Sequence, residues 1–153
     1  MKRTIGIASA VAIALAAGAA GAGTVAPGDI QIAEMVIATS LTGETGDADA
    51  GAKAFADRKL GNCLACHAVS KLSKELFHGN VGPSLDGVAD RYSPEQLRAI
   101  IVNSKAVFGD QTVMPGFYSL EVGKDVDEKF QGKTILSAQD VENVVAFLTT
   151  LKE

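Results

Sequence analysis

The segment Cys63-Leu64-Ala65-Cys66-His67 constrains this chain more than any other feature, because it reads Cys-x-x-Cys-His. This pattern is the attachment signature of a c-type haem. The two thiols can add to the two vinyl groups of haem, and their spacing of three places both on one face of a helical turn. His67 follows directly and can offer an imidazole nitrogen to the iron. We therefore expect one covalently bound haem c, attached at Cys63 and Cys66, with His67 as an axial ligand.

Other uses of a Cys-x-x-Cys pair fit this chain less well. A thioredoxin-like redox pair is typical of a βαβ setting, and nothing around residues 45–90 alternates like a strand. A structural zinc site needs four ligands, whereas the chain has only two cysteines and one further histidine, His78. A disulfide across two residues would close a small, strained loop.

The first 22 residues have the pattern of an export signal. A positive start, Met1-Lys2-Arg3, precedes an Ala- and Gly-rich apolar run that ends at Ala20-Gly21-Ala22. This predicts a cleaved signal peptide over residues 1–22. A membrane anchor is the alternative, because about 19 residues can just span a bilayer. However, Ala and Gly contribute little transfer free energy, and no positive stop-transfer cluster follows. Haem attachment in bacteria is expected outside the cytoplasmic membrane, so we expect a periplasmic protein without a membrane anchor.

Net charge narrows the class of partner. The chain has 14 Lys and Arg against 18 Asp and Glu, and removal of Lys2 and Arg3 leaves a net charge of −6. Such a balance argues against nucleic acid and does not favour an anionic lipid surface. A soluble protein partner is the class that remains.

Beyond the signal peptide, the chain divides into an arm, residues 23–48, and a domain, residues 49–153. The arm is apolar over residues 30–37 but shows no helical stripe, so it cannot form a core alone. It either lies on the domain or docks on another subunit, and its apolar character favours the second. The pattern does not indicate a role for the charged stretch 121–133.

Three segments of the domain have helical patterns. The first is expected to begin near Asp47 or Asp49 and to end at Gly61, with Phe55 and Leu60 toward a core. The second starts at Ser93, where Pro94 and Gln96 complete a capping signature. The third starts at Ser137, and apolar residues then repeat at the helical period, namely Val141, Val144, Val145 and Leu148. Because no segment alternates like a strand, we expect an all-α fold.

Few residues can supply a second ligand to the iron. Met114 precedes Pro115, which disfavours helix and predicts a stiff loop suited to presenting a sulfur. A thioether opposite histidine raises the reduction potential and closes the iron to substrates. An ordinary core methionine is the alternative. His78 is a rival that would give a bis-histidine haem, and Met35 in the arm is the weakest candidate.

The turn Gly82-Pro83-Ser84-Leu85-Asp86-Gly87-Val88 is the third informative stretch. A metal-bound histidine normally has a hydrogen-bond acceptor for its other ring nitrogen. The carbonyl of Pro83 could be that acceptor for His67, although a simple connecting loop would have the same composition.

Together these motifs resemble class I cytochromes c. The resemblance is carried by Cys63-Leu64-Ala65-Cys66-His67, by the Gly82-Pro83 turn, by Met114-Pro115 and by the apolar C-terminal helix. It implies a class I cytochrome c fold, an all-α domain wrapped around one haem. It also implies that Pro83 accepts a hydrogen bond from His67 and that Met114 is the distal ligand. In such a fold Gly51, Phe55 and Phe147 pack the first and last helices together.

The chain is more specifically similar to the X subunits of SoxAX sulfur-oxidation cytochrome complexes. The similarity runs from about Leu41 to the C-terminus, and its segments are residues 40–43, 61–67, 79–85, 112–115, 132–133, 135–136 and 141–148. It implies a heterodimer with an A subunit, a second c-type cytochrome that holds the catalytic haem. That complex is an L-cysteine S-thiosulfotransferase, which oxidatively joins thiosulfate to a cysteine of the YZ carrier. The X subunit passes the electrons to a downstream acceptor.

Counting ligands supports this division of labour. If Cys63 and Cys66 both hold haem, no thiol remains as a nucleophile, and a His67/Met114 iron has no open position. We therefore expect no catalytic residue in this chain. Two alternatives stay open: a free-standing electron shuttle, which would not need the 121–133 stretch, and a haem enzyme with an open iron, such as a peroxidase.

Overall fold

The structure, a computed structural model, describes residues 23–121 and 123–153, and the expected signal peptide lies outside the described residues. Its helices are α1 (Ala48–Ala56), α2 (Val88–Arg91), α3 (Pro94–Phe108) and α4 (Ala138–Leu148), with the 3-10 turns η1 (Pro27–Asp29), η2 (Cys63–Ala65), η3 (Ser70–Leu72) and η4 (Glu128–Phe130). Within the described ranges there is no strand, only one isolated bridge between Ala33 and Val36. The predicted all-α fold is confirmed.

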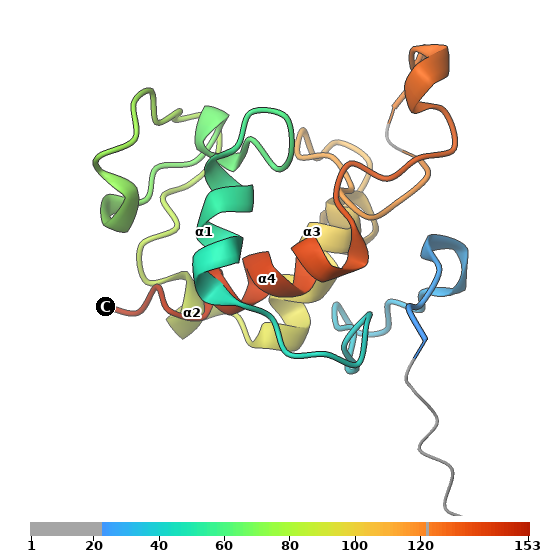
Figure 1. The fold of residues 1–153 in the computed structure, drawn as a ribbon, viewed down its shortest axis with the longest axis horizontal. Coiled ribbons are helices and arrows are strands. Elements are labelled where there is room, and N and C mark those ends of the chain that lie inside the picture. Colours follow the sequence, from blue (N-terminus) through green and yellow to red (C-terminus); the bar gives the residue numbers. More distant parts are fainter. Residues whose placement is uncertain (1–22, 122) are drawn as a thin grey trace, which may run out of the picture.

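Helices α1 and α4 pack against each other at the centre of the domain (Figure 1). The rings of Phe55 and Phe147 meet edge to face, with centroids 5.5 Å apart, and both side chains are buried. A Cβ atom at Gly51 would lie 1.9 Å from the carbonyl oxygen of Asn143, so only glycine allows this approach. The expected packing of these two helices is confirmed.

The start of α1 was predicted correctly, but its end was not. Asp47 caps the helix by accepting a hydrogen bond from the Ala50 N–H at 2.7 Å. The helix ends at Ala56 rather than Gly61, because Asp57 has extended backbone angles and its carboxylate accepts from the Lys59 N–H at 2.7 Å. This turn leaves Leu60 36% exposed instead of placing it in the core.

Helices α3 and α4 begin where their capping residues predicted. Ser93 and Gln96 exchange side-chain and backbone hydrogen bonds at the start of α3, and Ser137 and Asp140 do the same for α4. Inside α3, Asn103 has the non-helical angles φ −152° and ψ 88°, which interrupt the helix. Among the described residues, no helix combines the length and apolar character needed to cross a membrane.

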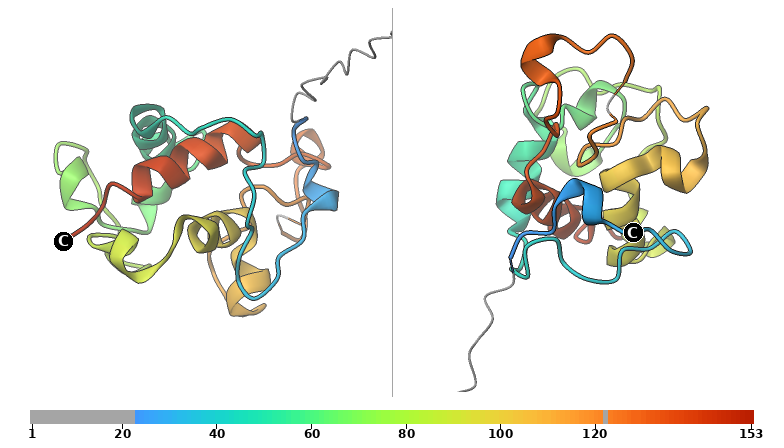
Figure 2. Two further views of the ribbon diagram at one scale, coloured as in Figure 1. Left: turned by 90° about the horizontal axis from the view of Figure 1, so that it is seen from below. Right: turned by 90° about the vertical axis from the view of Figure 1, so that its right-hand side faces the viewer.

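The arm lies against the domain, beside the N-terminal halves of α3 and α4 (Figure 2). Ile37 and Leu41 are buried in the common core, and the Ile37 N–H donates to the carbonyl of Glu95 at 3.1 Å. Near its start, Val25 is bound to Leu41 through the backbone and to the Tyr118 hydroxyl through its carbonyl. The arm thus adopts the alternative that its sequence favoured less.

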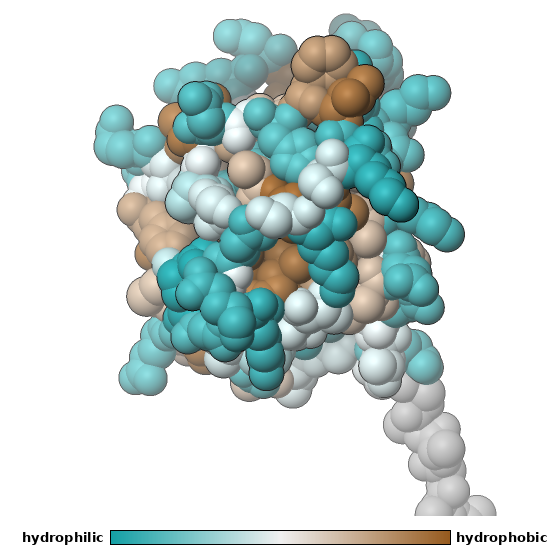
Figure 3. Space-filling view, turned by 90° about the vertical axis from the view of Figure 1, so that its left-hand side faces the viewer, coloured by the Kyte–Doolittle hydropathy of each residue, from teal (hydrophilic) through white to brown (hydrophobic). Residues whose placement is uncertain are grey.

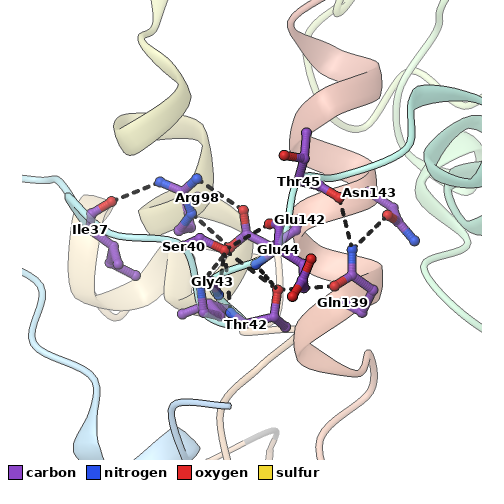
Figure 4. Close-up of polar contacts among 11 residues, drawn as sticks. Ile37, Ser40, Thr42, Gly43, Glu44, Thr45, Arg98, Gln139, Glu142 and Asn143 are labelled. Atoms are coloured by element: carbon purple, nitrogen blue, oxygen red, sulfur yellow. Dashed lines mark hydrogen bonds and ion pairs between the residues drawn. The ribbon is translucent and has the colours of Figure 1, made fainter. Parts of the chain in front are cut away.

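A buried ion pair holds the arm in place (Figure 4). The guanidinium of Arg98 in α3 donates to both carboxylate oxygens of Glu142 in α4, at 2.8 and 2.9 Å. The third nitrogen of Arg98 donates to the Ile37 carbonyl, and Glu142 accepts from the Leu41 N–H, each at 2.9 Å. We call these four residues the arm clasp. The clasp satisfies two buried charges and two arm backbone groups at one point.

Within the charged stretch, residues 123–133 extend outward from the body of the domain (Figure 1). It contains η4, and its Phe130 ring is 55% exposed beneath the Lys129 ammonium.

Candidate functional site

The Cys-x-x-Cys-His segment forms a single tight turn after α1. The turn η2 begins after Asn62, whose left-handed backbone (φ 48°) redirects the chain. The carbonyl of Cys63 then accepts from the N–H groups of Cys66 and His67, at 3.1 and 2.9 Å. Both cysteines are half-buried and carry free thiols. This geometry suits attachment of one group at two neighbouring sulfurs.

The surroundings of the Cys63 thiol disfavour its thiolate form. Burial raises the pKa of Cys63 to about 12 from its ordinary value of 9.0, and the adjacent Cys66 thiol adds to the rise. The Cys63 side chain packs against the hydrophobic core. Reactive cysteines need a lowered pKa. This environment therefore does not favour a reactive thiolate at Cys63.

The ring of His67 is held by the segment that contains Pro83. Nδ1 lies 2.8 Å from the Pro83 carbonyl oxygen, so with its proton on Nδ1 the ring donates this bond and leaves the Nε2 lone pair for a metal. Gly82 lies so close to the imidazole that a Cβ atom at this position would be 2.3 Å from Cε1 of His67. The Gly82 N–H donates to the Cys66 carbonyl at 2.9 Å, which ties the two segments together. The imidazole is therefore oriented before any ligand binds.

Met114 lies on the loop that follows α3, as Pro115 predicted. The side chain is half-buried and packs against the core. Its carbonyl accepts a hydrogen bond from the buried Ser104 hydroxyl at 2.5 Å, and Lys105 donates to the Thr112 carbonyl. Sequence reasoning missed Ser104 and Lys105, although two polar residues at the end of an apolar helical pattern were a usable signal.

His78 and Met35, the two alternatives to Met114 as second iron ligand, lie in different environments. Both ring nitrogens of His78 meet backbone groups: Nδ1 accepts from the Val69 N–H at 3.3 Å, and Nε2 lies 3.1 Å from the Leu72 carbonyl oxygen. This histidine therefore braces the loop that contains η3. Met35 lies in the arm, in a tight turn with a left-handed backbone (φ 66°), and is 39% exposed.

Apolar side chains stand at the surface next to the expected ligand segments. Val81, just before the Gly82-Pro83 turn, is 69% exposed, and Val113, just before Met114, is 79% exposed. Figure 3 shows the side on which residues 66–82 lie, where apolar surface is visible between polar side chains. A separate open hollow of about 710 Å³ is lined by Ala56, Arg58, Asn62, Leu64, Ala65 and residues 74–77, and its lining does not include the expected haem-binding residues. The two thiols, Nε2 of the oriented His67 ring and the apolar neighbours together fit a haem group.

Comparisons with known proteins agree with this chemistry. The profile of the family described as Cytochrome c matches residues 48–152. Among solved structures, the chain is similar to SoxXA from P. pantotrophus, with 39% identity, a TM-score of 0.78 and coverage of 85% of this chain and 99% of that chain.

Two further structures are more distant. Ferric cytochrome c-550 from Paracoccus versutus is 20% identical, with a TM-score of 0.40 and coverage of 71% of this chain and 99% of that chain. Cytochrome c2 from Paracoccus denitrificans is 19% identical, with a TM-score of 0.37 and coverage of 70% and 97%. No curated protein gave a significant match.

Proposed function

The chain belongs to the cytochrome c family, and on this premise we propose that it is the electron-transfer subunit of a periplasmic, thiosulfate-oxidising cytochrome complex. Family membership implies one covalently bound haem c and an electron-transfer role. The 39% identity to SoxXA over 85% of the chain supports the narrower assignment to an X subunit.

One observation carries the assignment of His67 as an iron ligand, namely the 2.8 Å contact between His67 Nδ1 and the Pro83 carbonyl. It fixes the ring and directs Nε2 to a metal, as the acceptor beside a metal-bound histidine does. Cys63 and Cys66 would hold the haem through thioether bonds, and His67 and Met114 would ligate its iron. When bound, the haem would supply one-electron redox chemistry.

The reaction of the complex needs a partner for this chain. Joining thiosulfate to a carrier cysteine forms one sulfur–sulfur bond, releases the thiol proton and yields two electrons. With Cys63 and Cys66 holding haem and with His67 and Met114 on its iron, this chain would offer the substrate neither a thiol nor an open iron position, which assigns the sulfur chemistry to a second c-type cytochrome, the A subunit. One haem accepts one electron at a time, so each turnover needs two transfers through this chain to a downstream acceptor.

The proposal includes the organisation of the chain. Residues 1–22 direct export and are removed, residues 23–48 form the arm, and residues 49–153 form the haem domain. The profile match from residue 48 and the start of α1 at Ala48 support the last boundary.

Thiosulfate-driven reduction of the haem tests the proposal. The oxidised, haem-loaded protein is mixed with thiosulfate and the carrier, with and without the A-type cytochrome, and haem reduction is followed by absorbance. Reduction should require the second cytochrome. Equal reduction without it, or none with it, would contradict the proposal.

Carbon monoxide binding tests the closed iron separately. The reduced protein should bind it slowly, whereas the Met114→Ala variant should bind it at once. Prompt binding by the unaltered protein would favour a haem enzyme with an open site instead.

A further inference from the structure

The loop that carries Met114 is fastened to α3 on both sides of the methionine. Ser104 is fully buried, with 0% of its surface exposed, and its hydroxyl donates to the Met114 carbonyl at 2.5 Å. On the preceding side, the Lys105 ammonium donates to the carbonyls of Thr112 and of Asp110, the latter at 3.1 Å. Two consecutive residues of α3 thus bind the backbone of the loop.

The segment that follows Met114 is hydrogen-bonded to α3 next to the helix interruption at Asn103. Its non-helical backbone leaves the carbonyls of Ile101 and Val102 available. They accept from the N–H groups of Phe117 and Tyr118, at 3.0 and 3.2 Å. The chain after Met114 therefore runs along the end of the helix, and the helix break is part of how this loop is held.

We infer that Ser104 is the positioning residue of the axial sulfur: its buried hydroxyl fixes the Met114 backbone, and Lys105 fixes the approach to it. Methionine has three rotatable side-chain bonds, so its sulfur keeps one place only if its backbone is fixed. Because the Ser104 hydroxyl bonds a carbonyl and not the sulfur, it acts through the loop. The inference rests on the proposed function, since it takes Met114 as an iron ligand.

The expected effect is a change in how easily another ligand displaces the methionine. Ser104→Ala removes one buried hydrogen bond, which corresponds to about fivefold to tenfold in an equilibrium constant. Imidazole competes with the sulfur for ferric iron, so its apparent affinity for the haem-loaded protein should rise by about that factor. The readout is the loss of the far-red charge-transfer band of the iron–sulfur bond as imidazole is added.

Variants on the same helix separate positioning from stability. Ser93→Ala removes the hydroxyl that caps the other end of α3, which lowers the stability of the helix by a similar amount without contact with the loop. Imidazole affinity should stay unchanged in that control. Lys105→Met should raise the affinity for imidazole, and Lys105→Arg should return it to the value of the unaltered protein. If Ser104→Ala does not take up haem, this pair of variants tests whether fixing the loop positions the sulfur.

The outcomes distinguish this inference from the proposed function. If the unaltered protein lacks the charge-transfer band, Met114 is not the ligand and both fail. If the band is present but Ser104→Ala and Ser93→Ala have equal affinities for imidazole, the positioning role is overturned and the ligand assignment stands. A rise confined to Ser104→Ala and Lys105→Met supports the inference.

Discussion

Breaking the arm clasp should be among the most destabilising conservative changes in this chain. Glu142→Gln keeps the shape of the side chain but leaves the Arg98 guanidinium buried without its counter-charge, since the two side chains are only 4% and 10% exposed. Breaking a buried pair costs about 3–5 kcal/mol, much more than an exposed one. Gln retains an oxygen that can still accept from Leu41, so we take the lower value, about 3 kcal/mol.

The assay is thermal unfolding of the haem-loaded protein, followed by circular dichroism. For a domain of this size each kcal/mol lowers Tm by about 4 °C, so the expected fall is about 12 °C. The matched control is Asp127→Asn, which breaks the exposed pair with Lys129, whose side chains are 59% and 65% exposed. Exposed pairs contribute about 0–1 kcal/mol, so the Tm of Asp127→Asn should be lower than that of the unaltered protein by less than about 4 °C.

Two results would refute this reasoning. If Glu142→Gln and Asp127→Asn lower Tm equally, the burial of the clasp does not determine its contribution. Arg98→Met combined with Glu142→Gln should cost less than the two single changes together, because the double variant leaves no unpaired charge. Strict additivity would show that the two charges do not act as a pair.

Three further predictions follow from individual contacts. Gly82→Ala should push the His67 ring away from Pro83, cost about 1–3 kcal/mol of stability and alter the ferric absorption spectrum; an unchanged spectrum would contradict the close contact. His78→Phe should destabilise the protein by about 1–3 kcal/mol through loss of the Val69 and Leu72 backbone contacts, measured by denaturant unfolding, with haem ligation unchanged. The hydrogen bonds from Ser70 lower the pKa of Asp86 below its ordinary value of 3.8, so the charged carboxylate stabilises the fold above that pH and this contribution is lost as pH falls below it. Ser70→Ala should therefore raise the pKa of Asp86 in an NMR titration, and an unchanged value would rule out the hydroxyl as the cause.

Local signals in the sequence predicted the features that depend on neighbouring residues. The Ser93 and Ser137 caps gave the starts of α3 and α4, because a capping box is made entirely by residues three apart. The contact between His67 and Pro83 was expected because a ligating imidazole needs an acceptor and the Gly82-Pro83 turn offers a carbonyl. The roles of these residues toward haem remain predictions.

The arm clasp depends on tertiary contact and was not predicted. Arg98 and Glu142 are 44 residues apart, so no local rule pairs them. A signal was present, because Glu142 lies four residues after Ala138 and three before Val145, within the apolar stripe of its helix. A charge on that stripe indicates a buried partner, although the position of that partner in α3 could not be read from it.

The ends and interruptions of helices were the least predictable features. Asp57 ends α1 four residues before the expected Gly61, because an aspartate side chain can form its own turn as readily as it accompanies a helix. Asn103 interrupts α3 where the apolar residues Ile100, Ile101 and Val102 give way to polar ones. The carbonyls of Ile101 and Val102 accept instead from Phe117 and Tyr118, which lie beyond the loop. The helical periodicity of the sequence cannot predict such hydrogen bonds.

Purification from the native host under mild conditions tests the central claim most directly. The protein should be recovered with a second c-type cytochrome in equal amount, as one heterodimer that carries the haem of this chain in a six-coordinate state. Recovery only as a monomer, with no second cytochrome at any stage, would contradict the account and favour a free-standing electron shuttle.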